Sequence, residues 1–235
     1  MGMEYVKDLC SIVIPIWNKA EETRGFCEKA IESIVEHVKY PYELILVDNA
    51  SAFPLTGEFL YKIFFVTGKE TILYCLPENV GFGPAVNYGA TKARGEYLCQ
   101  MNSDCELVED SVSILIEVMN KHDLAVGMPE NYGACKHYGL SKAPVLMGKD
   151  WRFGAFWVMR RSVWDEIGGF DEGYISGYFE DSDAWKKIEA LGYKIAGWRG
   201  TWVYHIGNAS SHPDRDKYFQ MNRERYEKRW SVKYP

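Results

Sequence analysis

The sequence predicts an α/β fold in which helices flank a mixed, mainly parallel central sheet. Three features of the 235-residue chain support this prediction. Short apolar, β-branched runs recur through the first part of the chain, a helical pattern of apolar residues separates them, and polar residues follow several runs. Buried strands that alternate with helices form a parallel sheet covered on both faces. Ligands of such sheets bind beyond the carboxyl ends of the strands.

Four buried strands are predicted in the first part, because apolar residues dominate four short runs. The runs cover residues 11–17, 43–48, 71–76 and 96–101. A helix is predicted over residues 21–38, with one apolar face made of Phe26, Ala30, Ile34 and Val38. The polar residues that follow three of these strands are Asn18, Asp48, Asn49, Asn102 and Asp104. The sequence therefore places its candidate ligand-binding residues at one edge of the sheet.

The second part of the chain has a less regular pattern. Residues 120–150 are rich in Gly, Pro and Lys and show no sustained periodicity, so we expect a long loop there. Loops of that length are often functional. No internal repeat or low-complexity linker divides the chain, which predicts a single domain over residues 1–235.

Two strands and two helices are predicted in this second part. The strands are expected near residues 193–197 and 202–205, and the helices over residues 180–191 and 213–230. Ser210 or Ser211 and Pro213 would open the last helix, because Ser is favoured just before a helix and Pro at its first position.

Composition and charge exclude several classes of protein. Hydrophobic residues make up 47% and charged residues 26%, which is typical of a soluble globular chain. The net charge of -6 disfavours nucleic acid as a partner, because such binding depends on neutralising phosphates. No apolar run is long enough for a transmembrane segment and no secretory signal is visible, so a cytoplasmic protein is expected. The six cysteines lack Cys-x-x-Cys spacing and are expected to be reduced core residues.

Asn102, Ser103 and Asp104 directly follow a predicted strand. A carboxylate at the ligand edge of the sheet can bind a hard divalent cation, and magnesium typically uses one or two carboxylates together with substrate phosphates and water. Asn and Asp are also favoured in ordinary turns. On these three residues alone, a plain turn or helix cap is an equal alternative.

Three carboxylates, those of Glu180, Asp181 and Asp183, occur within four residues at the start of a predicted helix. A carboxylate that projects into a cleft from a fixed helix start can act as a general base. Acidic residues also stabilise a helix N-terminus through its dipole, which is the structural alternative. The preceding residues 168–174 are rich in Gly and aromatic residues, as a cleft-lining loop would be, and favour the functional interpretation.

Two further motifs carry weaker signals. His205 ends a predicted strand; a single histidine is usually structural, but neutral imidazole is also a common metal ligand. Residues 79–89 form a glycine-rich turn that opens a helix, where backbone amides can approach a phosphate or a base. The P-loop motif is missing from the sequence.

Taken together and in this order, the motifs resemble glycosyltransferase family 2, whose members are inverting enzymes of GT-A fold. The resemblance covers residues 9–230 and rests on SIVIPIWN at 11–18, LILVDNAS at 44–51, ENVGFGPAVNYG at 78–89, MNSD at 101–104, GGFDEGY at 168–174, FEDSDAW at 179–185, His205 and NRERYEKRW at 222–230. The ENVGFG stretch is most similar to members that transfer rhamnose, galactofuranose or similar sugars to cell-surface polysaccharides. The resemblance implies a nucleotide-binding half, about residues 1–105, and an acceptor-binding catalytic half, about residues 106–235.

This resemblance implies two substrates. The donor would be a nucleotide sugar linked to UDP, dTDP or GDP. Its binding residues would be Pro15, Ile16, Asn18, Asp48, Asn79, Gly81, Asn87, Asn102 and Ser103. The acceptor would be a saccharide or glycan in contact with Trp151, Tyr178 and Asp183. Trp157 and Tyr174 offer further flat faces, with burial in the core as the alternative, and cationic side chains of residues 223–229 would close over the diphosphate or line a solvated helix face.

The resemblance also implies a metal and a base. Asp104 matches the last aspartate of the family's Asp-x-Asp motif and would bind Mn²⁺ or Mg²⁺ with His205 as a second ligand. Asp181 matches the catalytic base, with Glu180 and Asp183 beside it in the acceptor site. Asn102 departs from the family pattern, because an aspartate often stands there. This departure lowers the number of direct ligands, although the donor diphosphate could complete the site.

Transfer of one sugar per visit is the expected reaction, since the chain lacks the Gln-x-x-Arg-Trp signature of processive synthases. Two alternatives stay open. A non-catalytic sugar- or nucleotide-binding module would fit if Asn102 marks decay of the metal site. A sugar nucleotidyltransferase is less favoured, because no glycine-rich, arginine-containing loop follows the first strand. A homodimer is compatible with the sequence.

Overall fold

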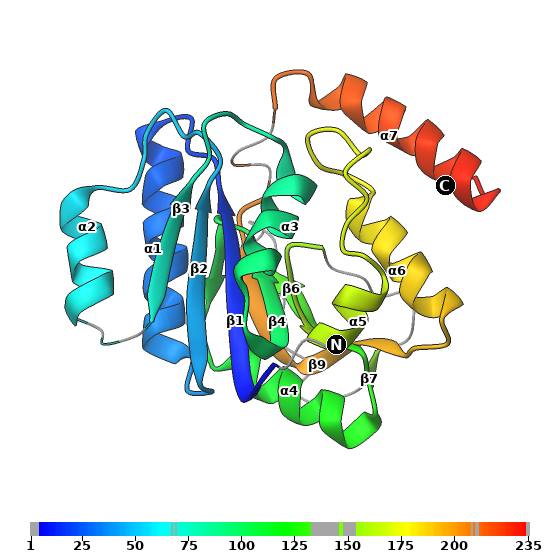
Figure 1. The fold of residues 1–235 in the computed structure, drawn as a ribbon, viewed down its shortest axis with the longest axis horizontal. Coiled ribbons are helices and arrows are strands. Elements are labelled where there is room, and N and C mark those ends of the chain that lie inside the picture. Colours follow the sequence, from blue (N-terminus) through cyan, green and yellow to red (C-terminus); the bar gives the residue numbers. More distant parts are fainter. Residues whose placement is uncertain are drawn as a thin grey trace.

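A computed structural model describes residues 5–66, 68, 70–132, 146–147, 154–207, 209 and 212–233. Nine strands of this part of the chain form one sheet in the order β3-β2-β1-β4-β8-β6-β9-β5, with β7 paired to β9 (Figure 1). Six of these nine strands run in the same direction, and β5, β7 and β8 run against them. The predicted α/β class with a mixed, mainly parallel sheet is confirmed.

The strands and helices follow the predicted order in the first part. The strands are β1 Val6–Ile16, β2 Tyr42–Asp48, β3 Thr71–Cys75, β4 Gly95–Met101, β5 Cys105–Leu107, β6 Val126–Tyr132, β7 Leu146–Met147, β8 Phe156–Arg160 and β9 Ile195–His205. The helices are α1 Glu21–His37, α2 Gly57–Tyr61 with the π-helical turn η1 Lys62–Val66, α3 Phe82–Lys92, α4 Ser111–His122, α5 Arg161–Glu166, α6 Glu180–Ala190 and α7 Arg215–Trp230. The four strands predicted before residue 102, and the helices predicted over residues 21–38, 180–191 and 213–230, are confirmed, with small differences at their ends.

The order of the parallel strands creates a switch point between β1 and β4. The chain passes from β1 through α1 to β2, and later from β3 through α3 back to β4 on the other side of β1. Because such crossovers are right-handed, α1 and α3 cover opposite faces of the sheet. Gly89 lets α3 approach the sheet closely, since a Cβ there would collide with the Val13 side chain. Open sheets bind ligands at such switch points, at the carboxyl ends of the strands.

The prediction of a long loop over residues 120–150 is wrong for those residues of this range that the structure describes. Helix α4 extends to His122, and β6 pairs with both β8 and β9. The strand was hidden in the sequence because it contains Gly127 and Pro129, which are unfavourable in strands. Gly127 packs under Met119 of α4, and Pro129 lies where the register with β9 shifts. Residues 133–145 and 148–153 lie outside the described residues.

Strand β9 is continuous, whereas two separate strands were expected there. Its pairing with β6 moves from Pro129–Trp198 directly to Glu130–Trp202, so residues 199–201 form an irregularity. The last part of β9 then pairs antiparallel with β5. This pairing sets His205 opposite Cys105, next to Asp104.

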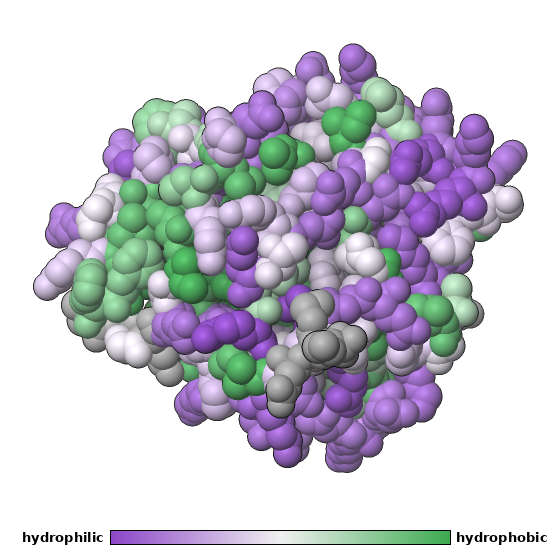
Figure 2. All heavy atoms as spheres, in the orientation of Figure 1, coloured by the Kyte–Doolittle hydropathy of each residue, from purple (hydrophilic) through white to green (hydrophobic). Residues whose placement is uncertain are grey.

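Most of the predicted core residues are buried. Cys10, Cys27, Cys99 and Cys105 are buried free thiols as expected, Cys75 is exposed, and Cys135 lies outside the described residues. Among the helices that are described, none has the length and apolar character needed to cross a membrane. Figure 2 shows hydrophobic residues gathered on the left, on the side of β3 and α2, and hydrophilic residues on the right, where α7 lies.

Candidate active site

A cavity of about 480 Å³ opens at the carboxyl ends of β1 and β4 and beside the end of β9. Strand ends form one wall, and the segment that enters α6 forms the opposite wall. Eleven of the residues predicted for the site line it: Pro15, Ile16, Asn79, Gly81, Asn102, Ser103, Asp104, Tyr178, Glu180, Asp181 and His205. The fold therefore gathers residues from nearly the whole length of the chain into one cleft.

The wall formed by the first half is held by Asn49, which follows β2. The Asn49 Nδ2 donates hydrogen bonds to Asn79 Oδ1 at 3.0 Å and to the Gly81 carbonyl at 3.1 Å. Its Oδ1 accepts the N–H of Val80 at 2.9 Å. Gly81 has a φ of 95°, a conformation that glycine adopts without the cost of a Cβ. Asn49 thus fixes the turn that leads into α3 against the end of β2.

Asp104 and His205 meet at the floor of the cavity. Asp104 Oδ1 lies 3.2 Å from His205 Nε2, and Asp104 Oδ2 accepts the N–H of Ala209 at 3.4 Å. Burial opposes ionisation of Asp104, but the hydrogen bond and charge of His205 outweigh burial and lower the pKa of this carboxyl below its ordinary value. The structure therefore holds a carboxylate and an imidazole together as a polar pair.

The donor atoms of this pair fit a divalent cation. Adjacent ligands of an octahedral ion with bonds of 2.0–2.1 Å lie about 3 Å apart, close to the Asp104–His205 separation. The Cys105 sulfur is near enough to join them, since all three groups have a ligand atom within 4.8 Å of the others. However, burial raises the pKa of the Cys105 thiol, which contacts the Ala155 carbonyl. A buried neutral thiol is a poor ligand for a hard cation, so Asp104 and His205 are the candidate ligands.

Asn102 lies beside this pair and takes part in a separate contact. Its Oδ1 accepts a hydrogen bond from Gln100 Nε2 at 2.8 Å. The Asn102 carbonyl also accepts the N–H of Cys105, which closes the turn between β4 and β5. The turn expected as an alternative is thus present, and it presents Ser103 and Asp104 to the cavity.

Two carboxylates at the start of α6 face the cavity from the opposite wall. Asp181 Oδ1 accepts the N–H of Ser182 at 2.6 Å, and its carboxylate lies against Gly154, where a Cβ would collide with it. Glu180 is 6% exposed, and its Oε2 has no hydrogen-bond partner among the described residues. Burial, and next the charge of Asp181, raise the pKa of Glu180 to about 8. The two neighbouring carboxyl groups therefore differ in environment.

The segment before these carboxylates has an unusual backbone. Ser176, Gly177, Tyr178 and Phe179 have consecutive φ values of 62°, 103°, 72° and 73°. A left-handed conformation costs about 1 kcal/mol or more for each residue that has a Cβ, so surrounding contacts must hold it. All four residues line the cavity.

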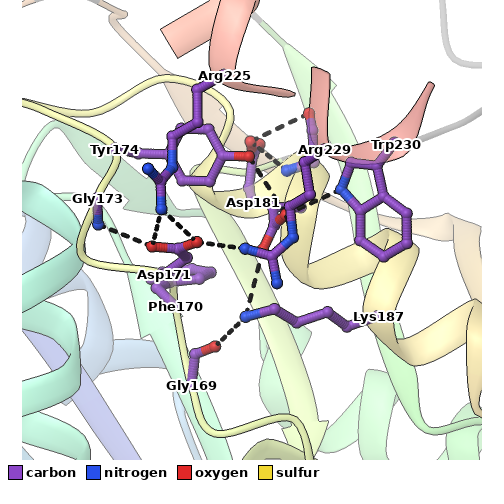
Figure 3. A network of polar contacts seen from close by, with 12 residues as sticks. Gly169, Phe170, Asp171, Gly173, Tyr174, Asp181, Lys187, Arg225, Arg229 and Trp230 are labelled. Carbon is purple, nitrogen blue, oxygen red and sulfur yellow. Dashed lines mark hydrogen bonds and ion pairs between the residues drawn. The ribbon is translucent and has the colours of Figure 1, made fainter. Parts of the chain in front are cut away.

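Helix α7 contacts the loop that precedes this segment through a network of charges (Figure 3). One nitrogen of Arg225 lies 2.9 Å from both oxygens of Asp171, and Arg229 also binds Asp171. Partial burial opposes ionisation of Asp171, but Arg225 and Arg229 hold the pKa of its carboxyl below the ordinary value. These two arginines were expected to cover a diphosphate or to line a solvated helix face; they stay partly exposed, at 45% and 39%, and also attach α7 to the loop.

Asp183 belongs to this network and does not line the cavity. Its carboxylate is fully buried and accepts hydrogen bonds from Tyr174 and from the indole of Trp230, at 3.2 and 2.9 Å. Arg229 and Lys187 lie 3.1 and 3.3 Å from it. These four partners enclose the carboxylate, so Asp183 is not accessible from the cavity. The prediction that Asp183 contacts the acceptor is therefore wrong for this arrangement.

Three predicted donor-binding residues also lie outside the cavity lining. The Asn18 side chain is fully buried, and Asp48 Oδ1 accepts the N–H of Ser51. Asn87 Nδ2 donates a hydrogen bond to the Phe170 carbonyl, and Asn87 Oδ1 accepts the N–H of Phe170, both at 2.9 Å. Asn87 Nδ2 also donates a hydrogen bond to Glu172. Asn87 thereby attaches α3 to the glycine-rich loop. Trp151 lies outside the described residues.

The structure also corrects the aromatic residues and the loop expected at the acceptor site. Trp157 and Tyr174 are buried, which is the alternative that the sequence left open. The glycine-rich residues 168–174 do not line the cavity, whereas residues 176–179 do. Trp17, His212 and Phe219 line the cavity without having been predicted. Trp17 is the last residue of the first apolar run and could have been found there, whereas no sequence signal marked the other two.

Comparisons with known proteins identify the family of this chain. A family model described as "Glycosyl transferase family 2" matches residues 11–183. An uncharacterized glycosyltransferase of Rickettsia conorii is 27% identical over 199 residues, which cover 77% of this chain and 31% of the relative. The chain thus spans less than a third of the length of this curated relative.

Solved structures of glycosyltransferases share the fold. TarS of S. aureus in complex with UDP-GlcNAc superposes with a TM-score of 0.67 at 14% identity, covering 92% of this chain and 65% of TarS. GalNAc-T7 with UDP, GalNAc and Mn²⁺ superposes with a TM-score of 0.69 at 17% identity, covering 93% and 50%. The fold is therefore that of GT-A glycosyltransferases. Because the family model spans most of the chain, this protein belongs to glycosyltransferase family 2.

Proposed function

We propose that this glycosyltransferase is a metal-dependent, inverting enzyme that moves one sugar from a nucleoside diphosphate to a hydroxyl of a saccharide acceptor. One observation carries the proposal: Asp181 and the Asp104–His205 pair line the same cavity, the first from the start of α6 and the second from the ends of β4 and β9. A candidate base and a candidate diphosphate site therefore share a space of about 480 Å³.

The donor lies along the wall formed by the first half of the chain. Pro15, Ile16 and Trp17 offer apolar and flat surfaces to a base, and the turn fixed by Asn49 places Asn79 and Gly81 beside the ribose and the diphosphate. The solved TarS and GalNAc-T7 complexes contain uridine nucleotides, which favours a UDP-sugar over dTDP- and GDP-sugars as the first donor to test.

The reaction is a single displacement. The acceptor oxygen attacks the anomeric carbon, the bond from that carbon to the diphosphate oxygen breaks, and the bonding electrons leave with the diphosphate. Asp181 accepts the proton of the attacking hydroxyl, and Gly154 leaves its carboxylate the room to reach this position. Glu180 holds its own proton at neutral pH and hydrogen-bonds the acceptor.

Asp104 and His205 would hold the cation, Mn²⁺ or Mg²⁺, at the diphosphate end of the cavity. When bound, it would supply positive charge to the leaving group, so that no second carboxylic acid is needed there. Ser103 and Asn102 lie next to this pair and orient the donor.

The acceptor enters between the two walls. Tyr178 presents its ring to the cavity, and a sugar can stack on such a face. We infer that the acceptor is a growing surface saccharide and that one sugar is added per visit.

The test is release of nucleoside diphosphate from UDP-, dTDP- and GDP-sugars in the presence of Mn²⁺, Mg²⁺ or a chelator. We expect turnover of one donor that needs the cation. Because a positioned base contributes about 100- to 10,000-fold, Asp181→Asn should lower kcat by that factor while nucleotide affinity stays nearly intact. Asp104→Ala should instead abolish the part of the nucleotide affinity that depends on the metal.

The control is Asp123→Asn at the end of α4, where the side chain is exposed far from the cavity. It makes the same chemical change and should keep full activity. Full activity of Asp181→Asn would exclude it as the base, and nucleotide affinity unchanged by chelator would exclude the metal site. Nucleotide binding without turnover of any donor, with saccharide acceptors present, would favour a binding module instead.

A further inference from the structure

Helix α7 carries a buried amide that the proposed reaction does not use. Asn222 is 2% exposed, although it lies on a helix with few buried residues. Its Nδ2 lies 2.9, 2.7 and 3.2 Å from the carbonyl oxygens of Ile175, Gly177 and Tyr178. Its Oδ1 accepts the N–H of Ile175 at 3.0 Å. All four contacts go to the backbone of one short segment.

That segment is the left-handed stretch that leads into α6. Three of its four residues carry a Cβ, and Phe179, the N-cap residue of α6, has no side-chain atom that could cap the helix. Contacts from elsewhere must therefore keep this backbone in place. Glu180 and Asp181 follow directly, so the path of the segment decides where the two carboxylates point.

Aromatic contacts from α7 reach the same segment. The ring of Phe179 lies 5.2 Å from that of Phe219 and 5.4 Å from that of Tyr226, and the ring of Tyr178 lies 5.6 Å from that of Phe219. Such contacts fix side chains without specifying peptide orientations. Asn222 supplies directional bonds, because an amide offers a hydrogen-bond donor and a hydrogen-bond acceptor at once.

We propose that Asn222 is a positioning residue for sugar transfer: its amide holds residues 175–178, which include most of the left-handed stretch at 176–179, and thereby aims Glu180 and Asp181 into the cavity. This inference rests on the proposed function. It gives a role to the NRERYEKRW motif, whose asparagine lies in a different part of the chain from the residues it positions. Among the described residues, the side-chain amide bonds to residues 175–178 and not to the wall formed by the first half of the chain, so its loss should affect turnover more than donor binding.

The experiment compares the full chain with Asn222→Ala and with Asn222→Asp. The second variant keeps the oxygen that accepts a hydrogen bond but loses the nitrogen that donates hydrogen bonds. Because a misplacement of about 1 Å can cost about 100-fold, both variants should lower kcat by about that factor. The Kd of the nucleoside diphosphate should stay within about threefold, since binding and turnover report separate interactions. Hydrogen exchange of the amides of residues 175–182 should accelerate at least about tenfold, with no change in β1 to β4.

Two further variants make the test specific. Met221→Ala changes the exposed neighbour on the same helix and should leave kcat, Kd and exchange as in the parent protein. Ser176→Gly, introduced into Asn222→Ala, removes a Cβ from a left-handed position and should recover part of the lost kcat.

The outcomes separate this inference from the proposed function. A kcat within twofold of the parent, or unchanged exchange in residues 175–182, would overturn the positioning role. Equal losses of kcat and nucleotide affinity, with faster exchange throughout the sheet, would also overturn it, because they would indicate general destabilisation. If the parent protein turned over no donor, the proposed function would fail, and the exchange comparison would still decide whether Asn222 holds the segment.

Discussion

The two walls of the cavity are built in different ways. On the donor side, Pro15, Ile16 and Asp104 lie at or just after the ends of paired strands, so the register of the sheet places them. On the catalytic side, Glu180 and Asp181 follow a left-handed segment that side chains of α7 hold in place. One wall is specified by backbone pairing between strands, and the other by a few side-chain contacts across long sequence distances.

The two walls also differ in the ionisation of a buried carboxyl group. Both walls bury polar side chains that must be satisfied or neutralised: Asn18, Asn49 and Asp104 on the donor wall, and Glu180, Asp183 and Asn222 on the catalytic wall. Burial raises the pKa of Glu180, whereas His205 lowers the pKa of Asp104 despite its burial. The stability of the catalytic wall should therefore fall as pH rises.

The largest effect on this contrast is expected from Glu180→Gln. Below about pH 4.5 the folded and unfolded chains both keep the Glu180 proton; between there and the raised pKa of about 8, only the folded chain keeps it. The free energy of unfolding of the parent should thus fall as pH rises through this window, by on the order of 5 kcal/mol relative to Glu180→Gln. Urea unfolding at a series of pH values measures the difference.

Glu224→Gln, on the exposed face of α7, is the control for this comparison. It should show the same pH dependence as the parent. A constant difference between the parent and Glu180→Gln from pH 4.5 to 8 would contradict the assignment of a bound proton to Glu180.

A smaller effect is expected from Asp183→Asn. The change keeps the shape but removes the charge that Arg229 and Lys187 face, and breaking buried pairs costs several kcal/mol. Because Arg229 is partly exposed, we expect a loss of about 2 kcal/mol in the free energy of unfolding. Asp216→Asn, with its side chain in solvent, serves as the matched control. Equal stability of Asp183→Asn and the parent would show that the network is not a stabilising device.

The smallest effect is expected from Asn49→Ala. This variant distinguishes the roles of the two walls most directly, because it should change the donor KM and not kcat. Losing three hydrogen bonds to the turn at residues 79–81 should raise the donor KM by about tenfold and leave kcat within about twofold. Asn222→Ala should instead lower kcat and leave donor binding nearly unchanged. Steady-state kinetics with varied donor concentration distinguish the two variants, and a fall in kcat alone for Asn49→Ala would remove the distinction between the walls.

The donor wall was largely predictable from the sequence. Apolar runs mark β1, β2, β3 and β4, and polar residues directly after a strand must lie near the ligand edge of a parallel sheet. Asn49 shows where this reasoning stops. Its place after β2 was visible, but its contacts with the turn at residues 79–81 depend on the tertiary structure.

The catalytic wall was less predictable, for physical reasons. The start of α6 was visible as a carboxylate cluster, but no periodic pattern marks a left-handed segment. Strand β6 was hidden by Gly127 and Pro129, whose places become favourable only through α4 and the shifted register of β9. The burial of Asp183 depends on Arg229 and Trp230, which lie on a helix far along the chain.

The irregularity in β9 has a consequence for changes in chain length. Residues 202–205 have their own pairing with residues 130–132 of β6 and with residues 105–107 of β5, so their register does not depend on the number of residues inside the irregularity. A shift by one residue within this paired part would reverse the face that each side chain occupies and would turn His205 away from Asp104. A change of chain length should therefore be better tolerated at residues 199–201 than at residues 202–205.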